Sequence, residues 1–139
     1  MNSKANKISV LGGNGFIGTN LISSLVSQNY NVMVLVRKRE NAKHLWPLPL
    51  TDIVEYENTI PSISKFIAES ETVINLVGVL QSKTGNPWGI EFENAHVKLT
   101  SSLVESSKLS GCKNIIHVSA LGTSYNAPSM YLRSKAEGE

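Results

Sequence analysis

The chain has 139 residues and a net charge of +2, and 41% of its residues are hydrophobic and 17% charged. This length suits one domain with its own core, and the small charge argues against nucleic acid or an anionic membrane surface as a partner. The lone cysteine, Cys112, cannot form an internal disulfide, which favours a reducing compartment. The longest apolar stretch, 73–80, is too short to span a membrane.

Short apolar runs alternate with amphipathic segments along the chain. We expect strands at 8–11, 32–36, 53–56, 72–77 and 114–119, and helices at 16–28, 41–46, 62–70, 91–109 and from Ser129 onward. Pro61 favours a helix start, and Gly111 favours a helix end. This alternation predicts an α/β domain with a doubly wound parallel sheet of about five strands, apolar on both faces and covered by helices on both.

A glycine-rich segment, Gly12-Gly13-Asn14-Gly15-Phe16-Ile17-Gly18, joins the first expected strand to the first expected helix. One glycine turns the chain sharply, another lets a pyrophosphate approach the backbone, and the last lets helix and strand pack closely. The helix N-terminus then offers free N–H groups to phosphate. A glycine turn without a ligand is the alternative, but the strand-to-helix context favours a Rossmann-type dinucleotide site formed by all seven residues.

The residues after the second expected strand bear on the choice of nicotinamide cofactor. NAD-binding domains place a carboxylate about 20 residues after the glycines, where it bonds the ribose 2′-hydroxyl. Here the sequence reads Arg37-Lys38-Arg39, and the nearest carboxylate is Glu40. A guanidinium can grip a 2′-phosphate, so NADP(H) is favoured over NAD(H), with Arg37 as the best candidate. The alternative is that all three cations lie in a solvated loop.

Three further motifs follow the glycine loop: Val73-Ile74-Asn75-Leu76-Val77-Gly78, His117-Val118-Ser119-Ala120-Leu121-Gly122 and Tyr131-Leu132-Arg133-Ser134-Lys135-Ala136-Glu137-Gly138-Glu139. With them, the chain resembles the extended and atypical branch of the short-chain dehydrogenase/reductase superfamily, the NAD-dependent epimerase/dehydratase group. Within that group it is most similar to the NADPH-holding accessory subunit of mitochondrial complex I and its bacterial relatives.

The resemblance implies roles for several residues outside the glycine loop. Val77 and Gly78, at the end of the fourth strand, would line the cofactor. The segment 55–58 has no clear match to the adenine-contacting motif of many relatives, so no residue is assigned to the adenine. His96 stands where many relatives carry Asn, and we expect it to be a structural side chain.

The resemblance also implies a catalytic group of Ser119, Tyr131 and Lys135. The Tyr would carry the substrate proton, the Lys would lower the pKa of the Tyr and bond the nicotinamide ribose, and the Ser would orient the substrate. Tyr131 and Lys135 are four residues apart and so share one helix face, as many surface pairs also do. The loop between Ser119 and Tyr131 is shorter than in typical epimerases, so activity does not follow from the motif.

Three functional hypotheses remain open. The chain is a nucleotide-holding accessory module like the complex I subunit, an oxidoreductase or epimerase acting on a hydroxyl or carbonyl substrate, or an inactive truncated fragment. We expect residues 1–139 to be one NAD(P)-binding domain that lacks the family's C-terminal region. The strand at 114–119 would then be an open edge, covered by another chain or a respiratory complex, and the last helix would have little to pack against.

The expected location is the cytoplasm, or the mitochondrial matrix side for a eukaryotic source, with peripheral attachment to the inner membrane as an alternative. The expected ligand is a dinucleotide, and no metal site is expected.

Overall fold

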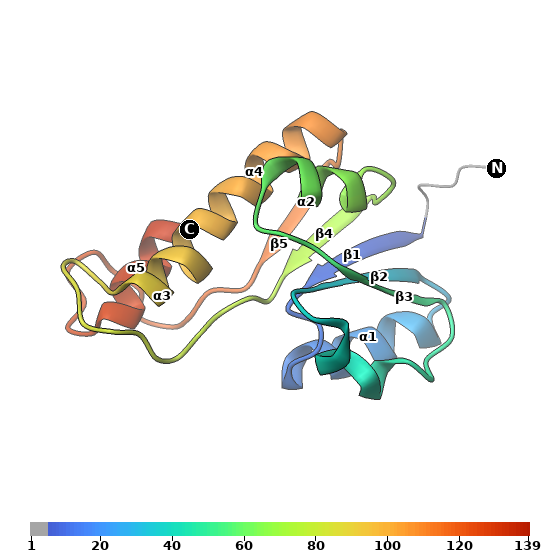
Figure 1. The fold of residues 1–139 in the computed structure, drawn as a ribbon, viewed down its shortest axis with the longest axis horizontal. Helices are drawn as coiled ribbons and strands as arrows, with labels where there is room; N and C mark the ends of the chain where they lie inside the picture. Colours follow the sequence, from blue (N-terminus) through green and yellow to red (C-terminus); the bar gives the residue numbers. More distant parts are fainter. Residues whose placement is uncertain (1–5) are drawn as a thin grey trace.

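The computed structural model describes residues 6–139, which form a five-stranded parallel sheet in the order β3-β2-β1-β4-β5 (Figure 1). The strands are β1 (Lys7–Leu11), β2 (Asn31–Val36), β3 (Thr51–Glu55), β4 (Thr72–Asn75) and β5 (Asn114–His117). Both neighbours of the central β1 run parallel to it, in a register that places Val10 beside Val34 and Ile74. The predicted doubly wound α/β architecture is confirmed.

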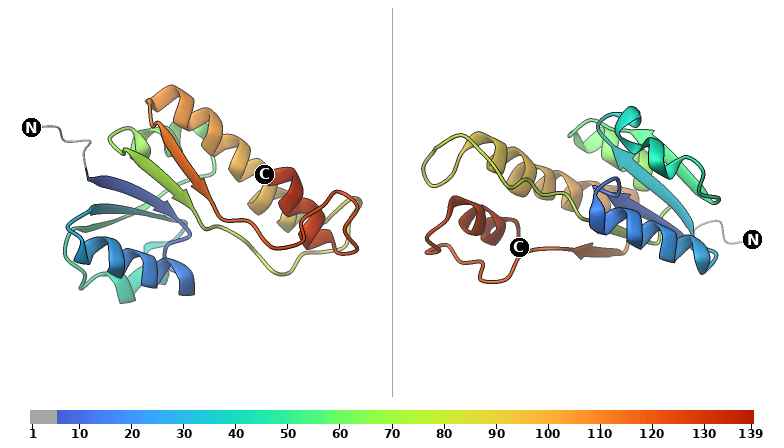
Figure 2. Two further views of the ribbon diagram at one scale, coloured as in Figure 1. Left: turned by 180° about the vertical axis from the view of Figure 1, so that it is seen from behind. Right: turned by 90° about the horizontal axis from the view of Figure 1, so that it is seen from below.

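Helices cover both faces of this sheet (Figures 1 and 2). The helical segments are α1 (Phe16–Ser27), the 3₁₀ helix η1 (Arg39–Leu45), α2 (Ile60–Ile67), α3 (Ile90–Phe92), the π-helical η2 (Glu93–Lys98), α4 (Leu99–Ser110) and α5 (Met130–Gly138). On one face α1 and η1 pack against the sheet, and on the other α2 and α4 do so. The last helix, α5, lies beside α3, beyond the ends of β4 and β5.

Each face of the sheet has its own core, because successive strand side chains point to opposite faces. Val10 and Val34 point toward α1, where they meet Ile22. Leu11 and Leu35 point the other way, into the cluster formed by α2 and α4. All five side chains are fully buried. The carboxyl ends of the strands therefore lie between two packed layers.

Several boundaries differ from those predicted. The strand expected at 53–56 spans 51–55, and the helix expected at 62–70 spans 60–67 because Thr59 caps it: the Thr59 hydroxyl accepts from the Ser62 N–H at 3.3 Å. The strands β4 and β5 each end two residues earlier than expected. The helix expected at 91–109 is divided by the π-helical η2. Periodicity does not reveal such breaks, because they depend on contacts with distant segments.

The strand β5 departs from the expectation that every strand is apolar on two covered faces. Within residues 6–139 it pairs only with β4, and Ile116 is 53% exposed. Ile115 and Val118 are also exposed. This part of the sheet is an open apolar edge, as the sequence predicted for 114–119.

The expectation that the last helix has little to pack against is wrong. Ser134, Lys135 and Ala136 of α5 are buried, and the helix packs on η2 and α3. The contact is so close that a Cβ on Gly138 would overlap the carbonyl of His96. Small residues on one side of α5 let its backbone approach η2, so tertiary contact within the chain holds this helix.

A paired substitution tests the packing role of the glycine loop. Gly18→Ala would place its Cβ on the backbone of Gly13, whereas the Cβ of Gly15→Ala would meet only the Gly12 carbonyl oxygen, at 3.7 Å. We expect Gly18→Ala to lower the free energy of unfolding by about 1–3 kcal/mol and Gly15→Ala to change it little. Urea denaturation followed by circular dichroism measures both, and equal losses would contradict this packing role.

Candidate functional site

A hollow of about 260 Å³ opens at the carboxyl ends of β1, β2 and β4. The glycine loop contributes Gly12, Asn14 and Gly15 to its lining, and the adjoining segment 76–79 after β4 forms another wall. The strand order reverses at this point: β2 and β3 lie on one side of β1, and β4 and β5 lie on the other. Ligands of open α/β sheets bind at such a topological switch point.

The glycines of the loop have distinct tasks. Gly12 has a φ of +76°, and a Cβ there would come within 2.9 Å of the Leu76 and Val77 backbone. Gly13 and Gly18 are buried and let α1 sit close to the loop. Gly15 faces open space at the start of α1. Among these four glycines, Gly15 is the one where an added Cβ would make no contact shorter than 3.7 Å.

The start of α1 presents free N–H groups to this space. Gly15 is the N-cap residue, and no side chain caps the helix. The first N–H groups of a helix have no intrahelical acceptor, so those of Phe16 and Ile17 remain available. Both side chains point to solvent, with exposed fractions of 87% and 60%.

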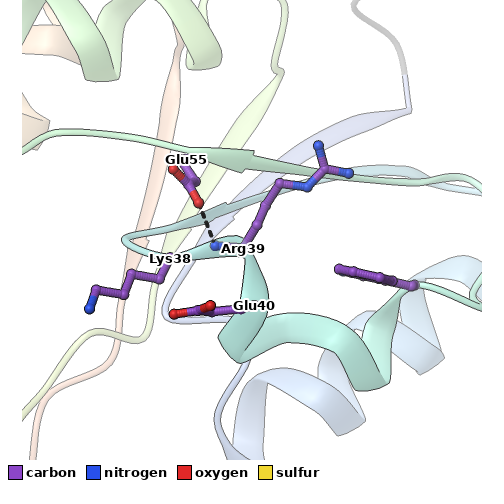
Figure 3. A pocket seen from close by; sticks show the side chains of 5 residues that line it. Lys38, Arg39, Glu40 and Glu55 are labelled. Carbon is purple, nitrogen blue, oxygen red and sulfur yellow. Dashed lines mark hydrogen bonds between the residues drawn. The ribbon is translucent and has the colours of Figure 1, made fainter.

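The three cations after β2 border two hollows. Arg37 and Lys38 line the hollow over the glycine loop. Lys38 and Arg39 line a neighbouring hollow beside β3, where the Arg39 backbone N–H donates to the Glu55 carboxylate at 2.8 Å. Figure 3 shows the Lys38 and Arg39 side chains pointing in opposite directions. Arg39 does not line the hollow over the glycine loop, so a substitution there is a suitable control for the same substitution at Arg37.

Sequence reasoning missed Tyr56, which lines the same hollow directly after β3. Its side chain is buried, and its N–H donates to the Val36 carbonyl at 3.0 Å. Burial raises the pKa of the Tyr56 hydroxyl, and the nearby Arg37 charge partly opposes that shift. Segment 55–58 does not match the adenine-contacting motif of relatives, but its position directly after a strand, at the carboxyl ends of the sheet, is the signal that could have identified Tyr56.

The proposed catalytic residues come from two parts of the chain: Ser119 follows β5, and Tyr131 and Lys135 belong to α5. Lys135 is only 3% exposed, and its ammonium donates to the Val118 carbonyl at 3.0 Å, next to Ser119. Burial lowers the pKa of Lys135, and the Glu139 carboxylate opposes that shift. The Ser119 hydroxyl donates to the same carboxylate. Within residues 6–139, no hydrogen bond joins Ser119, Tyr131 and Lys135 directly.

Tyr131 lines a second hollow of about 480 Å³, together with Leu80, Phe92 and Met130. Its ring packs edge-on against the rings of Phe92 and His96, with centroids 6.0 and 5.4 Å away. The wall of the first hollow ends at Val79, and the second begins at the next residue. One continuous segment after β4 therefore borders both hollows.

These features define a Rossmann-type α/β domain with a ligand hollow at its switch point. The sequence profile of the NAD dependent epimerase/dehydratase family matches residues 8–135, and the chain belongs to this family.

Named relatives extend this comparison. The mouse NADH dehydrogenase [ubiquinone] 1 alpha subcomplex subunit 9 is 30% identical over 135 residues, which cover 94% of this chain and 35% of that protein. A Stigmatella aurantiaca ketoreductase of a farnesylated dihydroquinoline oxide is 26% identical over 113 residues, covering 79% of this chain and 32% of the enzyme. The chain thus spans about a third of the length of these relatives.

Solved structures support the same fold. UDP-glucuronic acid 4-epimerase from Bacillus cereus, solved with NAD, superposes with a TM-score of 0.74 at 22% identity. The match covers 95% of this chain and 50% of the epimerase. Within residues 6–139, no helix has the length and apolar character needed to cross a lipid bilayer.

The lowered pKa of Lys135 predicts a pH dependence of stability. Between the folded-state pKa and the unfolded value near 10.5, the unfolded chain binds more protons, so stability rises with pH in that window. Lys135→Met removes this contribution. We expect the native chain to gain stability relative to Lys135→Met between pH 8 and pH 10.5. Urea unfolding at both pH values measures the difference, and a relative loss by the native chain would contradict the prediction.

Proposed function

We propose that this chain holds NADP(H) in the hollow over its glycine loop. The observation that carries the proposal is the composition of that hollow: Arg37 and Lys38 line it, and no Asp or Glu does so among the described residues. A ribose 2′-hydroxyl lacks its usual carboxylate partner here, whereas a 2′-phosphate meets two cations.

The proposed pose follows from the two ends of the hollow. The pyrophosphate lies over Gly15, at the positive end of the α1 dipole. The 2′-phosphate lies against Arg37, and the adenine packs near the buried ring of Tyr56. The nicotinamide end then extends past Val79 toward Tyr131 in the second hollow.

The proposed role is that of a nucleotide-holding module of an accessory subunit. Sequence similarity to complex I subunits covers 94% of this chain in mouse, Arabidopsis thaliana and Neurospora crassa. The partner in this proposal is a respiratory complex, and the nucleotide stabilises the fold by binding only the folded chain.

Arg37 lines the hollow over the glycine loop and Arg39 does not, so the two arginines give a test of cofactor choice. We expect the native chain to bind NADPH more tightly than NADH. Arg37→Ala loses a charge-assisted hydrogen bond and weakens NADPH binding by about tenfold or more, leaving NADH within about twofold. Titration calorimetry with both nucleotides measures this.

Two controls accompany that titration. Arg39→Ala removes the same charge from the neighbouring hollow and is expected to leave the NADPH affinity within about twofold. Gly15→Val fills the open space at the start of α1 and abolishes binding of both nucleotides without unfolding the chain. Tighter NADH binding by the native chain, or equal losses in the two arginine variants, would overturn the cofactor assignment.

A second candidate function is reduction of a carbonyl substrate. It is supported by Lys135, a buried cation beside Ser119, and by Tyr131, which lines the neighbouring hollow. Bound NADPH would supply the hydride to the carbonyl carbon, and the Tyr131 hydroxyl would give its proton to the carbonyl oxygen. The Lys135 ammonium stabilises the resulting phenolate.

Turnover of a panel of carbonyl substrates with NADPH separates the two candidate functions. If the native chain turns over any of them, Tyr131→Phe is expected to lower kcat by about 10²–10⁴-fold, because only the proton carrier is lost. NADPH affinity stays within about twofold, since the ring remains. Unchanged turnover in Tyr131→Phe would show that this pair takes no part in chemistry, and absence of turnover in the native chain would favour the nucleotide-holding role.

A further inference from the structure

His96 is a buried histidine whose two ring nitrogens both have partners. It lies in the π-helical η2 and is 1% exposed. Its Nε2 receives the Val79 N–H at 3.0 Å, and its Nδ1 lies 2.8 Å from the Ser134 hydroxyl. The ring therefore bridges the wall of the nucleotide hollow, after β4, to the helix that carries Tyr131.

These partners determine the protonation state of the ring. A backbone N–H can only donate, so Nε2 carries no proton and Nδ1 must carry it. The contact at Nδ1 leads to the same assignment. The Ser134 hydroxyl donates its single proton to the Tyr131 carbonyl at 2.9 Å, so its oxygen accepts a hydrogen bond from Nδ1–H of His96. Both ends of the bridge require the neutral Nδ1–H tautomer.

We propose that His96 is a positioning residue for the dinucleotide site, acting through this single tautomer. The ring holds the Val79 backbone against α5 and so fixes the wall shared by the two hollows. The role for nucleotide affinity rests on the proposed binding of NADP(H), whereas the bridge itself is a property of the free chain.

A second side chain holds the same wall from the sheet. The Asn75 side-chain carbonyl accepts from the Val77 N–H at 3.1 Å, and its amide donates to Nδ1 of His117 at 3.2 Å. His117 therefore carries its proton on Nε2, the opposite arrangement to His96. Two of the N–H groups after β4 thus end on side-chain acceptors, one in the sheet and one in η2.

The surroundings of His96 keep the ring neutral. Burial lowers its pKa to about 4, and the positive charge of Lys135 adds to that shift. Phe92 stacks on one side of the ring, and Tyr131 meets it edge-on. Histidine in this setting is a permanent acceptor for Val79 at neutral pH. Short π-helical segments occur frequently at functional sites, and His96 lies in such a segment, η2.

The tautomer can be measured directly, because the chain has only three histidines. Long-range ¹H–¹⁵N correlation spectra of the ¹⁵N-histidine-labelled free chain at pH 7 separate the two neutral forms. We expect His96 as Nδ1–H and His117 as Nε2–H, and single His→Gln variants assign the signals. An Nε2–H or doubly protonated His96 would overturn the proposal whatever the nucleotide does.

A variant pair then tests positioning against simple packing. His96→Leu keeps an apolar side chain of similar size but leaves the Val79 N–H without an acceptor. We expect faster amide exchange at Val79 and about tenfold weaker NADPH binding. His96→Gln, which restores an acceptor, recovers part of both. Leu103→Ala opens a cavity lower on the adjoining α4 and serves as the matched control, with lower stability but unchanged Val79 exchange and NADPH affinity within about twofold.

The outcomes separate the two proposals. If the native chain does not bind NADPH, the proposed function and the positioning role for affinity both fail, while the tautomer and Val79 exchange still decide the bridge. If the native chain binds NADPH but His96→Leu and Leu103→Ala weaken binding equally, His96 is only a packing residue and the inference is wrong. Selective loss in His96→Leu with recovery in His96→Gln supports it.

Discussion

The carboxyl edge of this sheet depends on backbone segments that pass one another with no side chain between them. Gly12 lies against the backbone that leaves β4, and Gly18 lies against Gly13 at the root of α1. A methyl group at any of the three would have to displace the main chain or the packed core. Because the segments touch, the N-terminus of α1, the wall after β4 and the end of β2 surround one hollow.

Features that depend on neighbouring residues were predictable from the sequence, and features that depend on distant contacts were not. The parallel sheet covered by helices on both faces, and the position of the glycine loop between a strand and a helix, follow from apolar runs and a local motif. The early end of β4 does not, because the Asn75 side chain bonds the Val77 N–H that a longer strand would have used. The bridge made by His96 joins elements 17 and 38 residues away, so spacing could not reveal it. The residue type of Tyr56 does not indicate a place in the hollow, whereas its position directly after β3 does.

The region around α5 concentrates polar groups that burial disfavours. Lys135 and His96 both have pKa values lowered first by burial, and the buried Nε2 of His117 has no partner within residues 6–139. Nonpolar residues in these places would stabilise a helix that had only to pack. A fold that keeps such groups despite their unfavourable effect on stability is typical of a working site, whether that site binds or reacts.

The strand order also constrains how the chain assembles during synthesis. The unit from β1 through α1 to β2 and β3 contains only short connections, so it can form early with little loop-closure entropy. Its central strand, β1, nevertheless keeps one open edge until β4 emerges some sixty residues later, since Ile8 pairs with Thr72 on that side. A ribosome-bound chain stopped before residue 72 therefore exposes the hydrogen-bonding edge of its most buried strand.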